Sequence, residues 1–136
     1  MFDISIPAGA NKIISLLQSN GYEAYVVGGC VRDSILGFIP KDWDICTSAT
    51  PEEVKHCLSN RTIDTGLKHG TVTIVADDGN YEVTTYRIDG DNSDNRHPDE
   101  VRFVTSLTED LARRDFTINA MAYNDTEMDL LISLAE

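Results

Sequence analysis

The chain has 136 residues and a formal net charge of −12, from 23 acidic and 11 basic side chains. This length fits a single domain, and a hydrophobic fraction of 41% is ordinary for a globular protein. No run approaches the roughly 18–20 apolar residues of a membrane span, and a chain this acidic is poorly suited to grip nucleic acid through its own surface.

The cysteines predict a cytoplasmic protein with free thiols. Cys30, Cys46 and Cys57 are odd in number and widely spaced, and no Cys-x-x-Cys pair occurs. This usage is typical of small core residues in a reducing compartment rather than of disulfides or metal ligands. The N-terminus also lacks the basic and long apolar segments of a signal peptide.

Apolar periodicity and turn residues predict a mixed α/β sheet with flanking helices, without strict alternation of strands and helices. One helix has a clear start, because Thr50 suits the N-cap, Pro51 the first turn and Glu53 a capping box. The stretch Asp77–Asn80 predicts a hairpin turn. The expected helices cover 7–18, 29–36, 51–58, 106–114 and 116–123, and the expected strands cover 23–27, 42–47, 61–64, 71–76, 81–87 and 101–104.

The stretch from Tyr25 to Ala49 carries the strongest chemical pattern, and it begins with a glycine turn. Gly28 and Gly29 separate an apolar strand from a short helix. Backbone N–H groups at such a turn suit a phosphate group. Arg32, one turn into the helix, adds a cation that can bind phosphate oxygens in a fork.

A pair of carboxylates follows in the same stretch. Asp42 and Asp44 flank Trp43 at the start of the next strand, where residues i and i+2 point to the same face. Two carboxylates this close repel each other unless a cation lies between them, and Mg²⁺ prefers such oxygen ligands. A phosphate cradle beside a carboxylate pair predicts metal-assisted phosphoryl or nucleotidyl transfer.

Two further groups each have two interpretations. Glu82, on a strand that could lie beside Asp44, is either a third carboxylate of the site or an exposed strand residue. Arg114, Asp115 and Asn119 could together hold a triphosphate and a ribose hydroxyl, or could form an ordinary surface helix end. The polar segment 89–100 predicts a long loop, either functional or disordered.

Three segments resemble one known family in their order and spacing: Gly28–Asp33, Asp42–Ala49 and Arg114–Ala122. They are similar to the head domain of the class II tRNA nucleotidyltransferases, which are the CCA-adding enzymes, and bacterial poly(A) polymerases share this domain. The resemblance covers about residues 10 to 125. The segment Glu82–Tyr86 and the loop through residues 96–98 also look like family segments.

The resemblance implies a polymerase-β-like nucleotidyltransferase fold and a two-metal mechanism. Asp42 and Asp44 would be the catalytic carboxylates that bind two Mg²⁺ ions, with Glu82 as the third carboxylate. The substrates would be ATP and CTP, whose α-phosphate is attacked by the 3′-hydroxyl of a tRNA. The residues implied to contact the nucleotide are Gly28, Gly29, Arg32, Arg114, Asp115 and Asn119.

The resemblance also implies that residues 1–136 are a catalytic head alone. The neck, body and tail domains, which in the family select the base and hold most of the tRNA, are absent. We therefore expect either a fragment of a longer enzyme or a catalytic core that needs a partner chain. We expect CCA addition to the tRNA 3′ end, because the head motifs begin almost at once. The alternatives are a nucleotide-binding module without accurate turnover and the head of a poly(A) polymerase.

Overall fold

The computed structural model describes residues 5–58, 62–66, 70–89, 101–112, 121–123 and 131–132. Its helices are α1 (Ala8–Ser19), α2 (Gly29–Ile35), α3 (Pro51–Cys57) and α4 (Leu107–Ala112). Its strands are β1 (Ala24–Val27), β2 (Asp44–Thr47), β3 (Thr62–Gly66), β4 (Thr71–Ala76), β5 (Gly79–Thr85), β6 (Arg87–Asp89), β7 (Val101–Phe103), β8 (Met121–Tyr123) and β9 (Leu131–Ile132).

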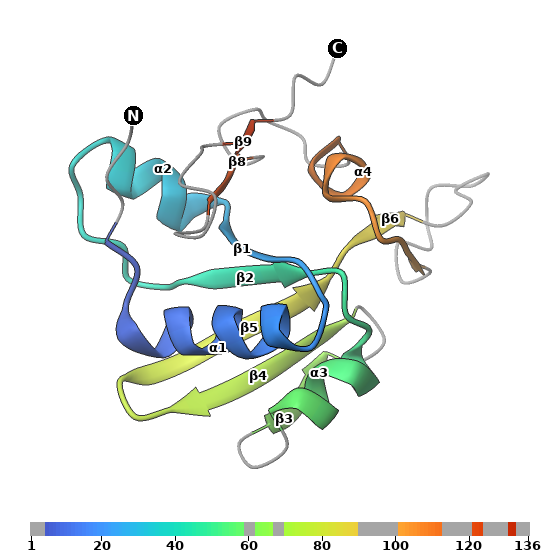
Figure 1. Ribbon diagram of the computed structural model, residues 1–136. Helices are drawn as coiled ribbons and strands as arrows, with labels where there is room; N and C mark the ends of the chain where they lie inside the picture. The colour runs from blue at the N-terminus through green and yellow to red at the C-terminus, as the bar shows by residue number, and fades with distance from the viewer. Residues whose placement is uncertain are drawn as a thin grey trace.

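Within the described residues, seven strands form a mixed sheet in the order β3-β4-β5-β2-β1-β8-β9, and β6 and β7 form a separate ribbon (Figure 1). All the recorded strand pairs are antiparallel except that of β2 with β5. A parallel pair needs a long crossover connection, which here runs through α3, β3 and β4. The predicted mixed sheet with flanking helices is therefore confirmed.

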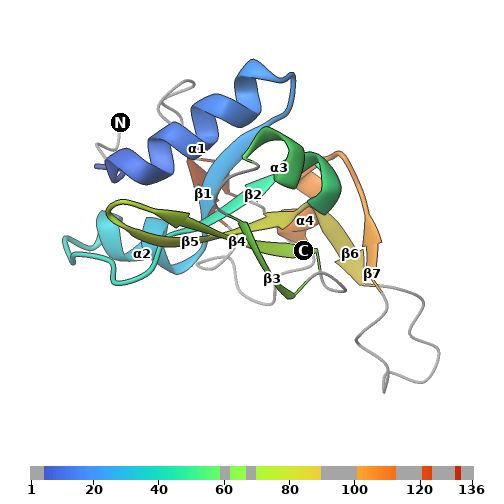
Figure 2. The same ribbon diagram turned by 90° about the horizontal axis from the view of Figure 1, so that it is seen from below.

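Helices α1 and α3 cover one face of this sheet (Figures 1 and 2). The apolar stripe of α1 is buried together with residues of α3 and of the central strands, and this cluster is the main core. None of the described helices has the length and apolar character that crossing a membrane requires. The fully buried members of this core include Leu17, Val26, Val31, Ile45, Val54, Val72 and Val83.

The described residues cover the opposite face of the sheet only in part. Leu107 and Leu111 of α4 pack there against Tyr25 and Tyr86 in a second, smaller cluster. Farther along β4 and β5 the same face carries polar side chains, including a threonine pair whose hydroxyls lie 3.0 Å apart, Thr71 and Thr84. This polar, open part of the sheet is where the candidate site lies.

The local signals for α3 and for the hairpin are confirmed. The Thr50 hydroxyl accepts the N–H of Glu53 at 3.3 Å, and the Glu53 carboxylate accepts the N–H of Thr50 at 2.8 Å, which completes the capping box. Strands β4 and β5 are joined by a two-residue turn, because Ala76 already pairs with Gly79. Gly79 has φ +139°, a conformation that L side chains rarely adopt.

The hairpin turn also caps the first helix. Helix α1 has no side-chain cap of its own and no acidic residue in its first turn. Asp78, from the turn, accepts the N–H of Gly9 at 3.0 Å and also interacts with the Tyr81 hydroxyl. These hydrogen bonds hold the pKa of the Asp78 carboxyl below its usual value, while burial, followed by the contact with Asp78, raises the pKa of Tyr81 to about 12.

Three predicted boundaries were wrong. Strand β2 begins at Asp44 rather than Asp42, because its ladder to β1 starts only at the pair of Asp44 with Val27. The expected strand 81–87 is interrupted at Tyr86, where the chain leaves the main sheet for the ribbon. The end of the expected helix 116–123 is strand β8, since pairing with β1 supplies the backbone partners of residues 121–123.

We predict that Thr50→Ala destabilises the fold by about 1 kcal/mol, because it removes one half of the capping box. Urea unfolding monitored by circular dichroism measures this loss. Ser15→Ala, on the exposed side of α1, is the control and should be neutral or slightly stabilising, since alanine is the better helix former. Equal stability of Thr50→Ala and wild type would contradict the role of the cap.

We further predict a pH-dependent loss of stability in Asp78→Ala. Because the folded pKa of Asp78 lies below its unfolded value of about 3.9, the stabilisation is fully present above that pH and is lost as the pH falls through the folded pKa. The difference from wild type in urea unfolding should therefore shrink below about pH 4. Asp78→Asn keeps an acceptor without a charge, so its loss at neutral pH should be smaller. That loss should shrink over the same pH range, because the titrating carboxyl belongs to the wild type.

Candidate active site

The candidate site is centred on the start of β2. Asp44 pairs with Val27 at the end of β1 and, on its other side, with Glu82 in the middle of β5. Register partners on neighbouring strands point to the same face, and neighbouring strands lie about 4.8 Å apart. The two exposed carboxylates of Asp44 and Glu82 are therefore side by side on the open face of the sheet, as the sequence predicted for their strands.

Asp42 lies two residues before the first residue of this strand and is also exposed. Exposure alternates through the segment, with Asp42 and Asp44 exposed, Trp43 partly buried and Ile45 fully buried. The Trp43 side chain packs against the main core and so fixes the backbone between the two aspartates. The same-side arrangement of Asp42 and Asp44 therefore stays a prediction, because Asp42 lies outside the regular strand.

The glycine turn follows directly after the strand position that pairs with Asp44. Gly28 is buried and has φ 85° and ψ −135°, a conformation that favours glycine. Its carbonyl accepts the N–H groups of Val31 and Arg32, both at 3.1 Å, so the N–H groups of Gly29 and Cys30 precede the hydrogen-bonded turns of α2. The structure thus brings the predicted phosphate turn next to the carboxylates.

The Arg32 side chain folds back over this turn. A Cβ atom at position 29 would lie 3.1 Å from Nη2 of Arg32, so any side chain there would displace the guanidinium. Arg32 Nε also donates to Asp33 Oδ1 at 3.1 Å, with the two side chains 36% and 31% exposed. Gly29 therefore leaves room for the Arg32 guanidinium in this position, and the Arg32 side chain reaches back to the end of α2 where Gly28 lies.

One neighbour of the site, the Cys30 thiol, was not predicted from the sequence. Its Sγ donates to the Val27 carbonyl at 3.4 Å. Burial, and next the nearby charge of Asp44, raise the pKa of Cys30 to about 11, although hydrogen bonds from the backbone, including that of Asp44, oppose this. The thiol is therefore neutral at physiological pH. The sequence signal that could have indicated this contact is the position of Cys30, which lies three residues after Val27 at the start of a helix.

The remaining predicted site residues lie outside the described part of the chain. These are Arg114, Asp115 and Asn119, together with positions 90–100 of the predicted loop. The ends of that loop are described, because Asp89 of β6 pairs with Val101 of β7. The proposal that these residues contact a nucleotide therefore remains a prediction.

The described residues contain no group of three or more His, Cys, Asp or Glu side chains arranged to hold a metal ion. The donor set nevertheless suits Mg²⁺, which commonly binds one or two protein carboxylates and completes its shell with water and substrate phosphates. Asp42 and Asp44 supply two exposed carboxylates, with Glu82 beside them.

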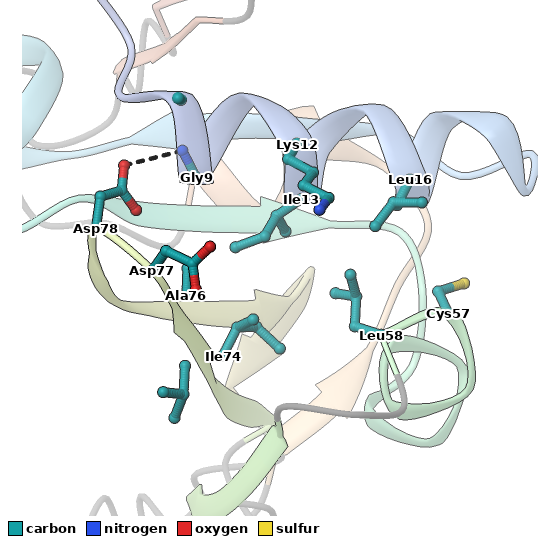
Figure 3. Close-up of a pocket in the computed structure, with 12 residues that line it drawn as sticks. Gly9, Lys12, Ile13, Leu16, Cys57, Leu58, Ile74, Ala76, Asp77 and Asp78 are labelled. Atoms are coloured by element: carbon teal, nitrogen blue, oxygen red, sulfur yellow. Dashed lines mark hydrogen bonds between the residues drawn. The ribbon is translucent and has the colours of Figure 1, made fainter.

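A cavity of about 520 Å³ lies elsewhere, between α1, α3 and β4 (Figure 3). Its walls include Ile13, Leu58 and Ile74. Glu82 pairs with Thr73, so the adjacent Ile74 points to the opposite face of the sheet. This cavity contains none of the predicted site residues, and we do not assign it to the nucleotide.

Solved structures with this arrangement identify the fold as that of the polymerase-β-like nucleotidyltransferases. A Bacillus stearothermophilus CCA-adding enzyme in complex with CTP matches with a TM-score of 0.79 and 48% identity, over 90% of this chain and 28% of that one. A tRNA nucleotidyltransferase complexed with a primer tRNA and an incoming ATP analog matches with a TM-score of 0.68 and 29% identity, over 90% of this chain and 34% of that one.

The chain belongs to the poly A polymerase head domain family, whose sequence profile matches residues 24–133. The CCA-adding enzyme of Lactiplantibacillus plantarum is 54% identical over 129 residues, which is 93% of this chain and 31% of that enzyme. The chain thus spans about a third of the length of the curated relatives it matches.

We predict that iodoacetamide at pH 8 labels Cys57 before Cys30, because Cys57 is the more exposed thiol and the pKa of Cys30 is raised to about 11. Asp44→Asn should speed the labelling of Cys30 by removing a charge that raises its pKa, whereas Glu52→Gln, exposed on α3, should not. Timed labelling followed by peptide mass spectrometry measures both rates. An unchanged Cys30 rate in Asp44→Asn would contradict the coupling.

Proposed function

We propose that this chain is the catalytic head of a CCA-adding enzyme, which transfers nucleotides from CTP and ATP to the 3′ end of tRNA. The observation that carries the proposal is the register of β2 and β5, which sets Asp44 beside Glu82 next to the glycine turn. Relatives named as CCA-adding enzymes over nearly the whole chain support this activity above poly(A) addition.

Each residue of the site has a role in this proposal. Asp42 and Asp44, with Glu82 as the third carboxylate, would hold Mg²⁺, which supplies Lewis-acid activation and charge neutralisation when bound. The Gly28–Gly29 turn lets the backbone approach the triphosphate closely, and Arg32 offers its guanidinium to phosphate oxygens.

The nucleotide is thereby oriented for in-line attack. The RNA 3′-hydroxyl attacks the α-phosphorus, the bond to the bridging oxygen of pyrophosphate breaks, and pyrophosphate leaves. Holding the reacting groups in this geometry supplies much of the acceleration. Arg114, Asp115 and Asn119 would contact the phosphates and ribose. Base selection and most of the grip on tRNA would belong to domains outside these residues, in the same chain or in a partner.

The single tryptophan gives a direct test of substrate binding, since Trp43 lies between the two aspartates. We predict that its fluorescence changes on titration with CTP in the presence of MgCl₂, and that Asp44→Asn weakens binding at least about tenfold, the effect of losing roughly 1.4 kcal/mol. Glu52→Gln is the control, because it removes one negative charge at an exposed position of α3, outside the candidate site. It should bind CTP as the wild type does. No Mg²⁺-dependent response in the wild-type chain would count against the proposed function.

Turnover is tested with radiolabelled CTP and ATP and a tRNA that lacks its terminal CCA. The wild-type chain should incorporate label. Asp42→Ala should lower the rate by more than about a hundredfold, because removing a metal ligand should cost more than the 10–100-fold that is typical of mutating a residue hydrogen-bonded to such a ligand. Incorporation of ATP alone into a long tail would instead indicate poly(A) addition. Nucleotide binding without incorporation would favour a binding module that depends on a partner chain.

A further inference from the structure

A small apolar patch is exposed beside the candidate site. Among the described residues, five large hydrophobic side chains are exposed, and three of them lie together in the segment after α2: Leu36 at 59%, Phe38 at 65% and Ile39 at 93%. The other two, Ile63 and Phe103, lie singly on strands. Adjacent exposed apolar side chains mark an interaction site more often than scattered ones do. We call residues 36–39 the apolar patch.

The backbone of the patch is fixed by the end of α2. The N–H of Gly37 donates to the Ser34 carbonyl at 3.2 Å and the N–H of Phe38 to the Asp33 carbonyl at 2.8 Å, with φ 87° at Gly37. These two bonds form a Schellman motif, in which the residue at the Phe38 position usually packs on an apolar residue at the Asp33 position. Here that position is Asp33, whose carboxylate is bonded to Arg32 and offers no apolar surface to Phe38. The Phe38 ring is accordingly exposed to solvent.

The patch is close to the carboxylates because of the chain that joins them. Phe38 is four residues before Asp42, so its Cα lies within about 14 Å of that of Asp42 even if the connection is fully extended. Stacked nucleotides in one strand are about 3.4 Å apart. The patch is therefore within reach of the last three or four nucleotides of an RNA whose 3′-hydroxyl lies at Asp42 and Asp44.

We propose that the apolar patch binds the unpaired bases at the 3′ end of the RNA substrate, with Phe38 as a stacking platform. This inference rests on the proposed function, which brings an RNA 3′ end to the neighbouring carboxylates. One exposed cation lies next to the patch and could meet the RNA backbone: Lys41 follows the patch, in a chain with only 11 basic residues and a net charge of −12. Aromatic stacking beside cations is how proteins hold single strands.

The test uses this chain and two fluorescein-labelled RNA hairpins, one with a four-nucleotide 3′ overhang and one with a blunt end. In fluorescence anisotropy titrations at low salt, the wild-type chain should prefer the overhang. Phe38→Ala should weaken overhang binding about tenfold, in the range that one lost stack costs, and Phe38→Tyr should retain it. Ile63→Ala, an exposed apolar residue on distant β3, is the matched control and should change nothing.

Two results would overturn the proposal: a wild-type chain that shows no preference for the overhang, or equal overhang binding by Phe38→Ala and wild type. If instead sedimentation shows a wild-type dimer that Phe38→Ala dissociates, the patch is a contact between copies of the chain. The Trp43 titration with CTP and Mg²⁺ separates this inference from the proposed function, since Phe38→Ala should respond as wild type does. A preference for the overhang in a chain that binds no nucleotide would refute the proposed function alone.

Discussion

The site depends on the parallel pairing of β2 with β5. A shift of this pairing by one residue would turn Glu82 to the opposite face from Asp44, because side chains alternate along a strand. The far end of the pair is held by specific bonds: the Tyr86 N–H donates to the Thr47 carbonyl at 2.8 Å, and the Thr85 hydroxyl donates to the Ala49 carbonyl at 2.6 Å. Buried hydrogen bonds at one end of β2 therefore keep the carboxylates aligned at the other.

The surroundings of the carboxylates explain why the site suits a cation. Arg32 is bonded to Asp33, and this pair of opposite charges adds no net charge. The thiol next to Asp44 is neutral, since burial and the carboxylate itself raise the pKa of Cys30. The exposed carboxylates thus create a negative field that a divalent ion with bound phosphates would relieve. The same field would repel an approaching RNA, which is why the exposed Lys41 beside the apolar patch matters.

The sequence predicted well those features that depend on neighbouring residues. The capping box of Thr50 and Glu53, the tight β4–β5 turn and the glycine turn each depend on residues a few positions apart, and the structure contains all three. The spacing of Asp42 and Asp44 also predicted that both would be exposed on either side of a more buried Trp43, as they are.

Features that depend on distant segments were harder to predict. The register of Asp44 with Glu82 joins positions 38 residues apart, and periodicity carries no information about which strands become neighbours. Residues 121–123 were assigned to a helix because their apolar character fits either structure, and pairing with β1 decided for a strand. The Cys30 thiol was missed for the same reason, since its contact with Asp44 arises only when β1 and β2 pair.

Because β6 and β7 pair with each other, the fold of the domain does not depend on the length of the chain between these two strands. Because Asp89 already pairs with Val101, the chain between them begins and ends at one place and has no distance to span. Loop closure depends only weakly on length, with each doubling costing about 0.6 kcal/mol. Insertions, deletions or a grafted label at positions 90–100 would therefore leave the sheet and its carboxylates in place. This segment could also diverge in sequence and length among relatives without altering the fold.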